Sequence, residues 1–362
     1  MDQTTSIVGR LKQIAAEHGV SPRAPRKGDR VGFAMSTMDR VDFTLRTLAG
    51  IDTESGFDLV WSDGSRTAEG RDLVKSYQTR NIPIVERNLD IGGGAAKANH
   101  FALKRVIELG YDYCGMIEND VVLEPGWFGK LMGTFEEAAE EGVAVGAATV
   151  RSYESRVLEY RQGYGLVYVM GWGMVLFPRS VAQLVVDQYY SFWAPNADNF
   201  LTYPKAPDSR LVSARSIRRF YAEVFGLDVA GAWELFAGMP DRPLEIDWAF
   251  APLLCKHGYA SVGSIPNSAL DLEYDVEFFL KTKYVGADKS NLGLVHPSVR
   301  LGSLWWMRLS DPFFEACWSL LHASPNLYRT ILALYRRWRP RRPRKLEGWS
   351  AASHRLAPSS PR

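Results

Sequence analysis

Short apolar runs and longer amphipathic segments alternate along the chain from Val31 onward. The runs are VGFAMST from Val31, FDLVWSD from Phe57, IPIVERN from Ile82 and YCGMI from Tyr113, and polar or small residues end or follow each of them. The segments between them repeat apolar side chains at helical spacing. This alternation predicts an α/β fold, in which helices cover both faces of a mostly parallel sheet.

The same pattern divides the chain into segments. A helix is expected between Thr4 and His18, before a basic linker that contains proline. A long aromatic-rich stretch interrupts the α/β pattern, and the Ser/Ala/Pro-rich C-terminal tail is expected to be disordered. The predicted boundaries are 1–29 for the helix and linker, 30–180 and 244–310 for two halves of the α/β domain, 181–243 for the aromatic insertion, 311–347 for a basic helical extension and 348–362 for the tail.

Composition narrows the class of protein. With 362 residues and 46% hydrophobic content, the chain can bury a large core. The net charge of +2 hides a basic excess near the C-terminal end, so no nucleic-acid partner is expected for the body. Three widely spaced cysteines in apolar runs fit a reducing compartment better than a disulfide framework. Since no signal peptide or membrane-spanning run is visible, we expect a cytoplasmic protein.

Two carboxylates follow the strand that begins at Tyr113. Glu118 and Asp120 flank Asn119, at the point where the apolar run stops. Loops at the carboxyl ends of parallel strands line the ligand crevice of α/β proteins, and paired carboxylates there can bind one hard cation. A solvated acidic turn is the alternative interpretation.

Small and polar residues also follow the second and third strands. Asp63 and Gly64 begin a turn that could be an ordinary loop. A glycine triplet centred on Gly93 opens the next helix, and free amides at a helix start suit a phosphate. Lys97, one turn later, is either a phosphate contact or a solvated lysine. The spacing matches neither the dinucleotide fingerprint nor the Walker motif, which argues against a nicotinamide enzyme.

In their order, these motifs resemble the nucleotide-sugar half of GT-A-fold glycosyltransferases, particularly family-2 enzymes. The motifs that carry the resemblance are VWSDGSRT, RNLDIGGGAAKAN and IENDVVLEPGWF, followed by GWGMVLFPRSV from Gly171 and LEIDWAF from Leu244. The resemblance implies a GT-A domain in which residues 30–180 bind a nucleotide sugar and residues 244–310 face the acceptor. In the family pattern an aspartate stands at Ser62, an aspartate at Glu118 and often an arginine at Lys97.

The resemblance further implies a metal-dependent, inverting transferase that moves a sugar from a nucleoside diphosphate sugar to a hydroxyl of a saccharide or lipid-linked saccharide, in cell-surface or secreted glycan synthesis. Retaining enzymes share this fold, so the stereochemistry stays open. Glu118 and Asp120 would hold Mn²⁺ or Mg²⁺, with His296 as the third ligand and Asp271 as its alternative. The implied donor contacts are Ser36, Asp39, Asp63, Gly64, Gly93, Lys97 and Asn119.

The resemblance also assigns the acceptor side. Asp247 would remove the proton from the attacking hydroxyl, a step in which a positioned base contributes about 10²–10⁴-fold. Glu245 is the alternative base, and Asp247 could also cap the helix that follows it. The expected acceptor contacts are Trp172, Gly173 and Trp248.

Two other segments and two other functions complete the expectations. The aromatic insertion is expected to be a lid over the acceptor or a helical subdomain core. Apolar and basic residues in 311–345 suit a helix on the anionic inner face of the plasma membrane, and a helix docked on the domain is the alternative. The alternative functions are a non-catalytic carbohydrate-binding or scaffold protein and a sugar-nucleotide nucleotidyltransferase, although the first strand lacks the glycine-rich loop of the latter.

Overall fold

The predicted apolar runs form the strands of one large sheet. The computed structural model describes residues 6–91, 94–151, 157–168, 170, 173–193, 211–212, 214–227, 244–245, 250–266 and 268–271. For 94–97, 189–193, 211–212, 214–216, 244–245 and 270–271, the description covers the backbone alone. The sheet strands are β1 (Val31–Thr37), β2 (Asp58–Asp63), β3 (Ile84–Asn88), β4 (Tyr113–Glu118), β6 (Val145–Thr149), β7 (Val157–Tyr160), β8 (Tyr164–Val167), β9 (Met174–Pro178) and β12 (Ala260–Ser264).

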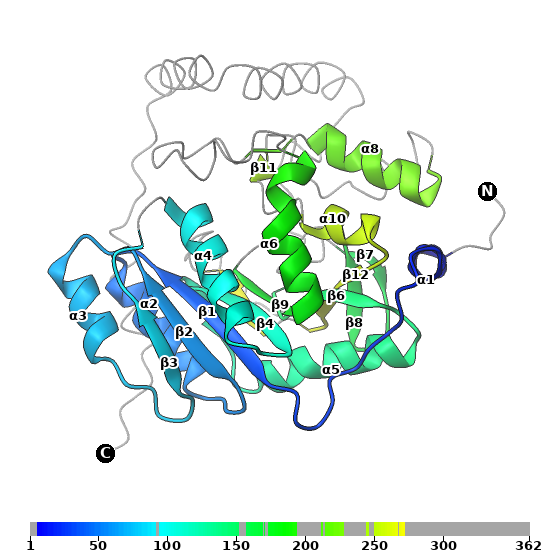
Figure 1. Cartoon of the computed structure of the whole chain (residues 1–362). Helices are drawn as coiled ribbons and strands as arrows, with labels where there is room; N and C mark the ends of the chain where they lie inside the picture. Colours follow the sequence, from blue (N-terminus) through cyan, green and yellow to red (C-terminus); the bar gives the residue numbers. More distant parts are fainter. Residues whose placement is uncertain are drawn as a thin grey trace, which may run out of the picture.

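The order of the strands is β3-β2-β1-β4-β9-β6-β12-β8-β7 (Figure 1). The pairs β2·β3, β1·β2, β1·β4 and β6·β12 are parallel, whereas β9 and β8 run against both of their neighbours. All strands except β9 and β8 therefore point in one direction. This result confirms the α/β fold class and the mostly parallel sheet that the sequence predicted.

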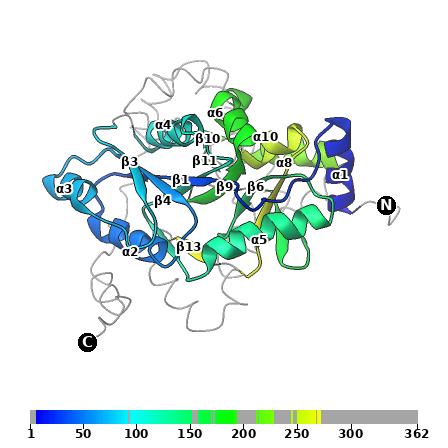
Figure 2. The same cartoon turned by 60° about the horizontal axis from the view of Figure 1, so that its bottom comes forward.

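Helices cover both faces of this sheet. Figures 1 and 2 show α4, α6 and α10 on one face and α2 and α5 on the other. The helices are α1 (Ile7–Glu17), α2 (Val41–Ile51), α3 (Ala68–Ser76), α4 (Gly94–Glu108), α5 (Trp127–Glu140), α6 (Arg179–Trp193), α8 (Ala214–Phe225) and α10 (Phe250–Lys256). Because both faces are covered, the central strands are apolar along their length, and β4, β6 and β9 are buried apart from half-buried Glu118.

Two short pairs of strands lie outside the large sheet. They are β5 (Val121–Leu123) with β13 (Ala269–Asp271), and β10 (Leu211–Val212) with β11 (Leu244–Glu245). Both pairs are antiparallel. Strand β5 directly follows the acidic turn after β4, and its pairing with β13 holds the end of that turn.

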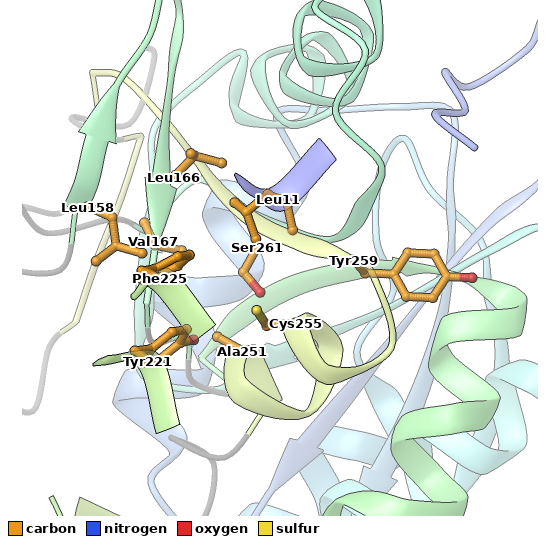
Figure 3. A pocket seen from close by; sticks show the side chains of 11 residues that line it. Leu11, Leu158, Leu166, Val167, Tyr221, Phe225, Ala251, Cys255, Tyr259 and Ser261 are labelled. Atoms are coloured by element: carbon orange, nitrogen blue, oxygen red, sulfur yellow. The ribbon is translucent and has the colours of Figure 1, made fainter. Parts of the chain in front are cut away.

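An apolar seam joins the N-terminal helix to the sheet (Figure 3). Here α1 meets α8, α10 and the strands β7, β8 and β12 around a small pocket. The side chains that define the seam are Leu11, Leu158, Leu166, Tyr221, Phe225, Cys255 and Tyr259. Buried apolar contact of this kind is what holds an otherwise short helix in place.

The predictions for the C-terminal part fall largely outside the described residues. This applies to the basic extension 311–347, the tail 348–362 and much of the insertion 181–243. In the part of the chain that the structure describes, no helix is both long enough and apolar enough to cross a bilayer.

Candidate functional site

Three neighbouring strands bring their carboxyl ends to one edge of the sheet. In the ladder, Ser36 of β1 lies between Ser62 of β2 and Glu118 of β4, and Thr37 lies opposite Asp63. Side chains alternate between faces along a strand, and ladder partners share a face. Ser62, Ser36 and Glu118 are therefore on one face at this edge, and Thr37 and Asp63 are on the other. The carboxyl ends of β2, β1 and β4 thus bring candidate residues from three separate segments to one edge of the sheet.

Asp63 is fully buried at this edge. Its Oδ1 accepts hydrogen bonds from Thr37 Oγ1 at 2.7 Å and from Ser65 Oγ at 2.6 Å. Its Oδ2 is also buried and has no hydrogen-bond partner among the described residues. A buried acceptor without a donor costs free energy, so this oxygen is suited to a donor that a ligand supplies.

Gly64 allows the turn after β2 to pack against the segment that precedes α4. A side-chain Cβ at Gly64 would lie 2.7 Å from the backbone oxygen of Ile91, too close for any other residue without a backbone shift. Gly64 N donates to Thr37 O at 2.9 Å, and Ile91 N donates to Asp63 O at 2.8 Å. These bonds tie the first strand, the Asp63 turn and the start of α4 together.

Asp39 fastens the loop after β1 to the start of α3. Its Oδ1 accepts hydrogen bonds from Thr67 N, Thr67 Oγ1 and Arg66 N, each at 2.8 Å. These bonds, those from Thr67 first, hold the pKa of the Asp39 carboxyl below its ordinary value. In return, Asp39 N donates to Ser65 Oγ at 2.9 Å. Asp39 thus supports the turn that carries Asp63.

Helix α2 holds the acidic turn after β4 along one side. Arg40 directly precedes α2, Thr44 and Thr47 lie on it, and each of the three contacts the segment 119–121. The contacts are Arg40 Nη1 with Asp120 Oδ2 at 2.9 Å, Asn119 Nδ2 donating to Thr44 Oγ1 at 3.0 Å, and Thr47 Oγ1 donating to Val121 O at 2.9 Å. Asn119 and Asp120 are consequently both buried.

Glu118 faces α4 and the start of β9. Its Oε1 lies 3.5 Å from Asn99 Nδ2 on α4. A Cβ on Gly173 would lie 3.4 Å from Glu118 Oε2 and only 1.6 Å from Arg151 Nη1. The guanidinium and the carboxylate therefore share the space that glycine leaves open at position 173. Sequence reasoning missed Arg151; the available signal was a cation just after the apolar strand β6.

The side-chain oxygens at this edge are of the type that binds a hard divalent cation. Glu118 and Asp120 offer carboxylate oxygens, which Mg²⁺ and Mn²⁺ prefer, while waters and phosphates can fill further positions. Within the described ranges, no group of three or more His, Cys, Asp or Glu residues is placed to hold a metal. Asp271 pairs with Val121 across β13 and β5, which puts its backbone beside the acidic turn.

The remaining candidates are placed only in part. Glu245 ends β11 and Lys97 lies in the first turn of α4, each with its backbone described. The candidates outside the described residues are Gly93, Trp172, Asp247, Trp248 and His296. Their roles stay predictions.

Comparison with known proteins finds likeness in structure and none in sequence. No family model matches the chain, and neither does any curated protein. Among solved structures, TarS from S. aureus is similar at 12% identity and a TM-score of 0.37, over 59% of this chain and 43% of that one. TarS 1–349 is similar at 13% identity and a TM-score of 0.36, over 86% of this chain and 93% of that one.

A third similar structure is the mannosyltransferase PcManGT from Pyrobaculum calidifontis in complex with GDP-Man and Mn²⁺. Its identity is 13% and its TM-score 0.37, over 95% of this chain and 96% of that one. The sheet and its helices agree with a fold of the GT-A type. All three TM-scores are below 0.5, so the proposal on function rests on the residues of the site.

Proposed function

We propose that this chain is a glycosyltransferase that uses a nucleoside diphosphate sugar and a divalent cation. The observation that carries the proposal is the meeting of the Asp63 turn and the acidic turn Glu118–Asp120 at one edge of the sheet. The Asp63 carboxylate can accept a hydrogen bond from a nucleoside, and Glu118 and Asp120 at the same edge can bind a cation. This combination suits a molecule that has both a base and a diphosphate.

The nucleotide sugar would contact the carboxylate oxygen of Asp63 that has no hydrogen bond in the described structure. Asp63 Oδ2 is buried and has no hydrogen-bond partner among the described residues, so an N–H or O–H of the nucleoside would supply a hydrogen bond that this oxygen lacks there. Ser36 Oγ is also buried and has no hydrogen-bond partner among the described residues; Ser36 lies opposite Glu118 in the ladder. Gly64 keeps the turn narrow, Asp39 supports it, and Asn119 holds the acidic turn against α2. Gly93 and Lys97 would lie near the phosphates.

Displacing a nucleoside diphosphate builds negative charge on the leaving oxygens. Mn²⁺ or Mg²⁺, held by Glu118 and Asp120 with His296 or Asp271, would stabilise that charge as a Lewis acid. Arg151 would add a positive charge beside Glu118, where Gly173 leaves room for its guanidinium. Its guanidinium can form two parallel hydrogen bonds with a phosphate, which orients the leaving group.

On the acceptor side, Asp247 would take the proton from the attacking hydroxyl, with Glu245 as the alternative base. Trp172, Gly173 and Trp248 would contact a saccharide or lipid-linked saccharide. Direct attack gives inversion at the sugar carbon. We extend the proposal to the synthesis of cell-surface or secreted glycans. The protein would be cytoplasmic and would bind the inner face of the plasma membrane through residues 311–345.

Thermal unfolding with a panel of nucleotide sugars tests the proposal, because a ligand of the native state stabilises it by RT ln(1 + [L]/Kd). We expect one nucleotide sugar to raise Tm with Mn²⁺ and to lose this effect with a chelator. Asp120→Ala should abolish the metal-dependent shift. Asp247→Ala should keep the shift and remove transfer of the sugar; transfer at the normal rate would exclude Asp247 as the base.

One observation favours the non-catalytic alternative. Asp120 already has a cation, because Arg40 Nη1 lies 2.9 Å from its Oδ2. A carbohydrate-binding protein derived from this fold could use that ion pair for structure alone. Saccharide binding that is indifferent to a chelator, without hydrolysis of any nucleotide sugar, would support this alternative.

A further inference from the structure

Arg40 and Asp120 form an ion pair at the centre of the site. Arg40 Nη1 lies 2.9 Å from Asp120 Oδ2, and the Asp120 side chain is only 10% exposed, against 42% for Arg40. Hydrogen bonds between charged groups are stronger than neutral ones, particularly where water is partly excluded. Arg40 is therefore the counter-ion of a carboxylate that our proposed function assigns to a divalent cation.

The backbone that carries Arg40 is in an unfavourable conformation. Asp39 has φ of 53° and Arg40 has φ of 31°, so two consecutive non-glycine residues occupy the left-handed region. Such residues cost free energy and persist only where the surroundings hold them. The contacts that hold them include the three hydrogen bonds to Asp39, the hydrogen bonds from Thr44 N and Thr44 Oγ1 to Arg40 O, and the ion pair to Asp120. Release of Arg40 from Asp120 would remove one of them.

Each of the two carboxylates proposed as metal ligands has an arginine side chain beside it. Glu118 and Asp120 carry one negative charge each. Arg40 lies on Asp120, and Arg151 shares the space beside Gly173 with Glu118. A divalent cation that binds Asp120 through Oδ2 has to displace the Arg40 guanidinium, and one that binds through the other oxygen is repelled by that guanidinium at close range. After that displacement the site holds excess positive charge, which a diphosphate can offset.

We propose that Arg40 is a resident counter-ion that competes with the divalent cation for Asp120. This inference rests on the proposed function of the same site. Arg40 keeps the carboxylate in position while the site is empty, and it weakens the binding of the metal alone. Metal and diphosphate consequently bind with positive coupling, because the released guanidinium lies at the same edge as the phosphates.

Titration of the full chain with Mn²⁺ alone tests this inference, with free Mn²⁺ followed by electron paramagnetic resonance. Arg40→Gln should bind Mn²⁺ about tenfold more tightly than the wild type at low ionic strength, because the competing charge is gone. Arg40→Lys keeps the charge and loses the fork, so its affinity should fall between the two. Asp120→Asn should bind at least about tenfold more weakly than the wild type.

Arg219→Gln is the matched control. It removes the same charge from an ion pair on α8, where Arg219 Nε lies 2.8 Å from Glu223 Oε1 and both side chains are exposed. Its Mn²⁺ affinity should equal that of the wild type. Thermal unfolding without metal verifies that each variant is folded, and Arg40→Lys carries the test if Arg40→Gln is not.

The outcomes separate this inference from the proposed function. If Asp120→Asn weakens Mn²⁺ binding while Arg40→Gln leaves it unchanged or weakens it, Arg40 does not compete, and the inference is overturned with the metal site intact. If Mn²⁺ binds with the same affinity to Asp120→Asn and the wild type, or binds to neither, the proposed metal site is wrong and the inference fails with it.

Discussion

The strand-end site and the apolar seam are both largely buried, yet they are built in opposite ways. At the site, Asp63 and Ser36 each keep a buried oxygen without a partner in the described structure, and Asp120 depends on a charged neighbour. In the seam, aliphatic and aromatic side chains from α1, α8 and α10 meet around a small pocket (Figure 3). Tyr221, a buried polar group there, donates its hydroxyl hydrogen to Tyr168 O at 2.8 Å.

This difference predicts that the site mainly affects ligand binding and that the seam mainly affects stability. Unpartnered buried oxygens lower stability and are retained where a ligand can satisfy them. Apolar packing raises stability and offers a ligand little to recognise. Substitutions at the site should therefore change binding and transfer more than folding, and substitutions in the seam should do the reverse.

Among the substitutions that compare these two regions, Gly173→Ala should have the largest effect. Its Cβ would lie 1.6 Å from Arg151 Nη1, so the guanidinium must leave its place beside Glu118. We expect a loss in kcat/KM of about 100-fold, which a misplacement of about 1 Å can cause, with little change in Tm. Gly133→Ala on α5 is the control, because no atom lies within 4 Å of its Cβ position. Equal activity of the two variants would contradict the role of Arg151.

Leu11→Ala should mainly reduce stability. Leu11 is 8% exposed and joins α1 to the seam, so its truncation should lower the free energy of unfolding by about 2 kcal/mol. Nucleotide-sugar binding should be unchanged. Leu45→Ala, at a side chain that is 40% exposed, should cost less than about 0.5 kcal/mol. Urea unfolding measures both, and a loss of donor binding in Leu11→Ala would show that the regions are coupled.

Asp39→Asn should have a smaller effect, which depends on pH. The pKa of Asp39 is lowered in the folded chain from an ordinary value of 3.8, so its carboxylate contributes stability above that value. The contribution is lost as the pH falls through the lowered pKa. At pH 7 we expect Asp39→Asn to cost about 0.5 kcal/mol, because the side chain is partly exposed. In urea unfolding the difference should be constant above the ordinary pKa of 3.8 and should shrink as the pH falls below it, and a difference that stays constant there would contradict this account.

The smallest expected effect is the labelling of the two buried thiols, Cys114 and Cys255, in the folded chain. Burial raises the pKa of Cys255 in the seam and of Cys114 in β4 to about 12. Both thiols therefore stay protonated near pH 8 and should resist iodoacetamide in the folded chain. In a Cys317→Ser background, we expect labelling only after denaturation. Rapid labelling of Cys255 alone would show that the seam opens while the rest of the chain stays folded.

The sequence by itself determined the fold class and the positions of the candidate chemistry. Apolar runs and helical repeats are local patterns, so the strands that begin at Val31 and Tyr113 could be predicted without a partner in view. The carboxyl ends of parallel strands share an edge, and for this reason Asp63 and Glu118 could be expected near each other. The roles of Asp247, Trp172 and His296 stay predictions, because these residues lie outside the described ranges.

Only the tertiary structure decided which of these polar groups are already engaged. Arg40 and Asp120 are 80 positions apart in the sequence, and Arg151, which follows β6, meets Gly173, which precedes β9. Asp39 supports the Asp63 turn through hydrogen bonds from Arg66 and Thr67, while its contact with a sugar donor stays a prediction. A local pattern encodes the conformation of a segment. The pairing of charges depends on strand register and on how a helix packs across the sheet, and these follow from the burial of side chains along the whole chain.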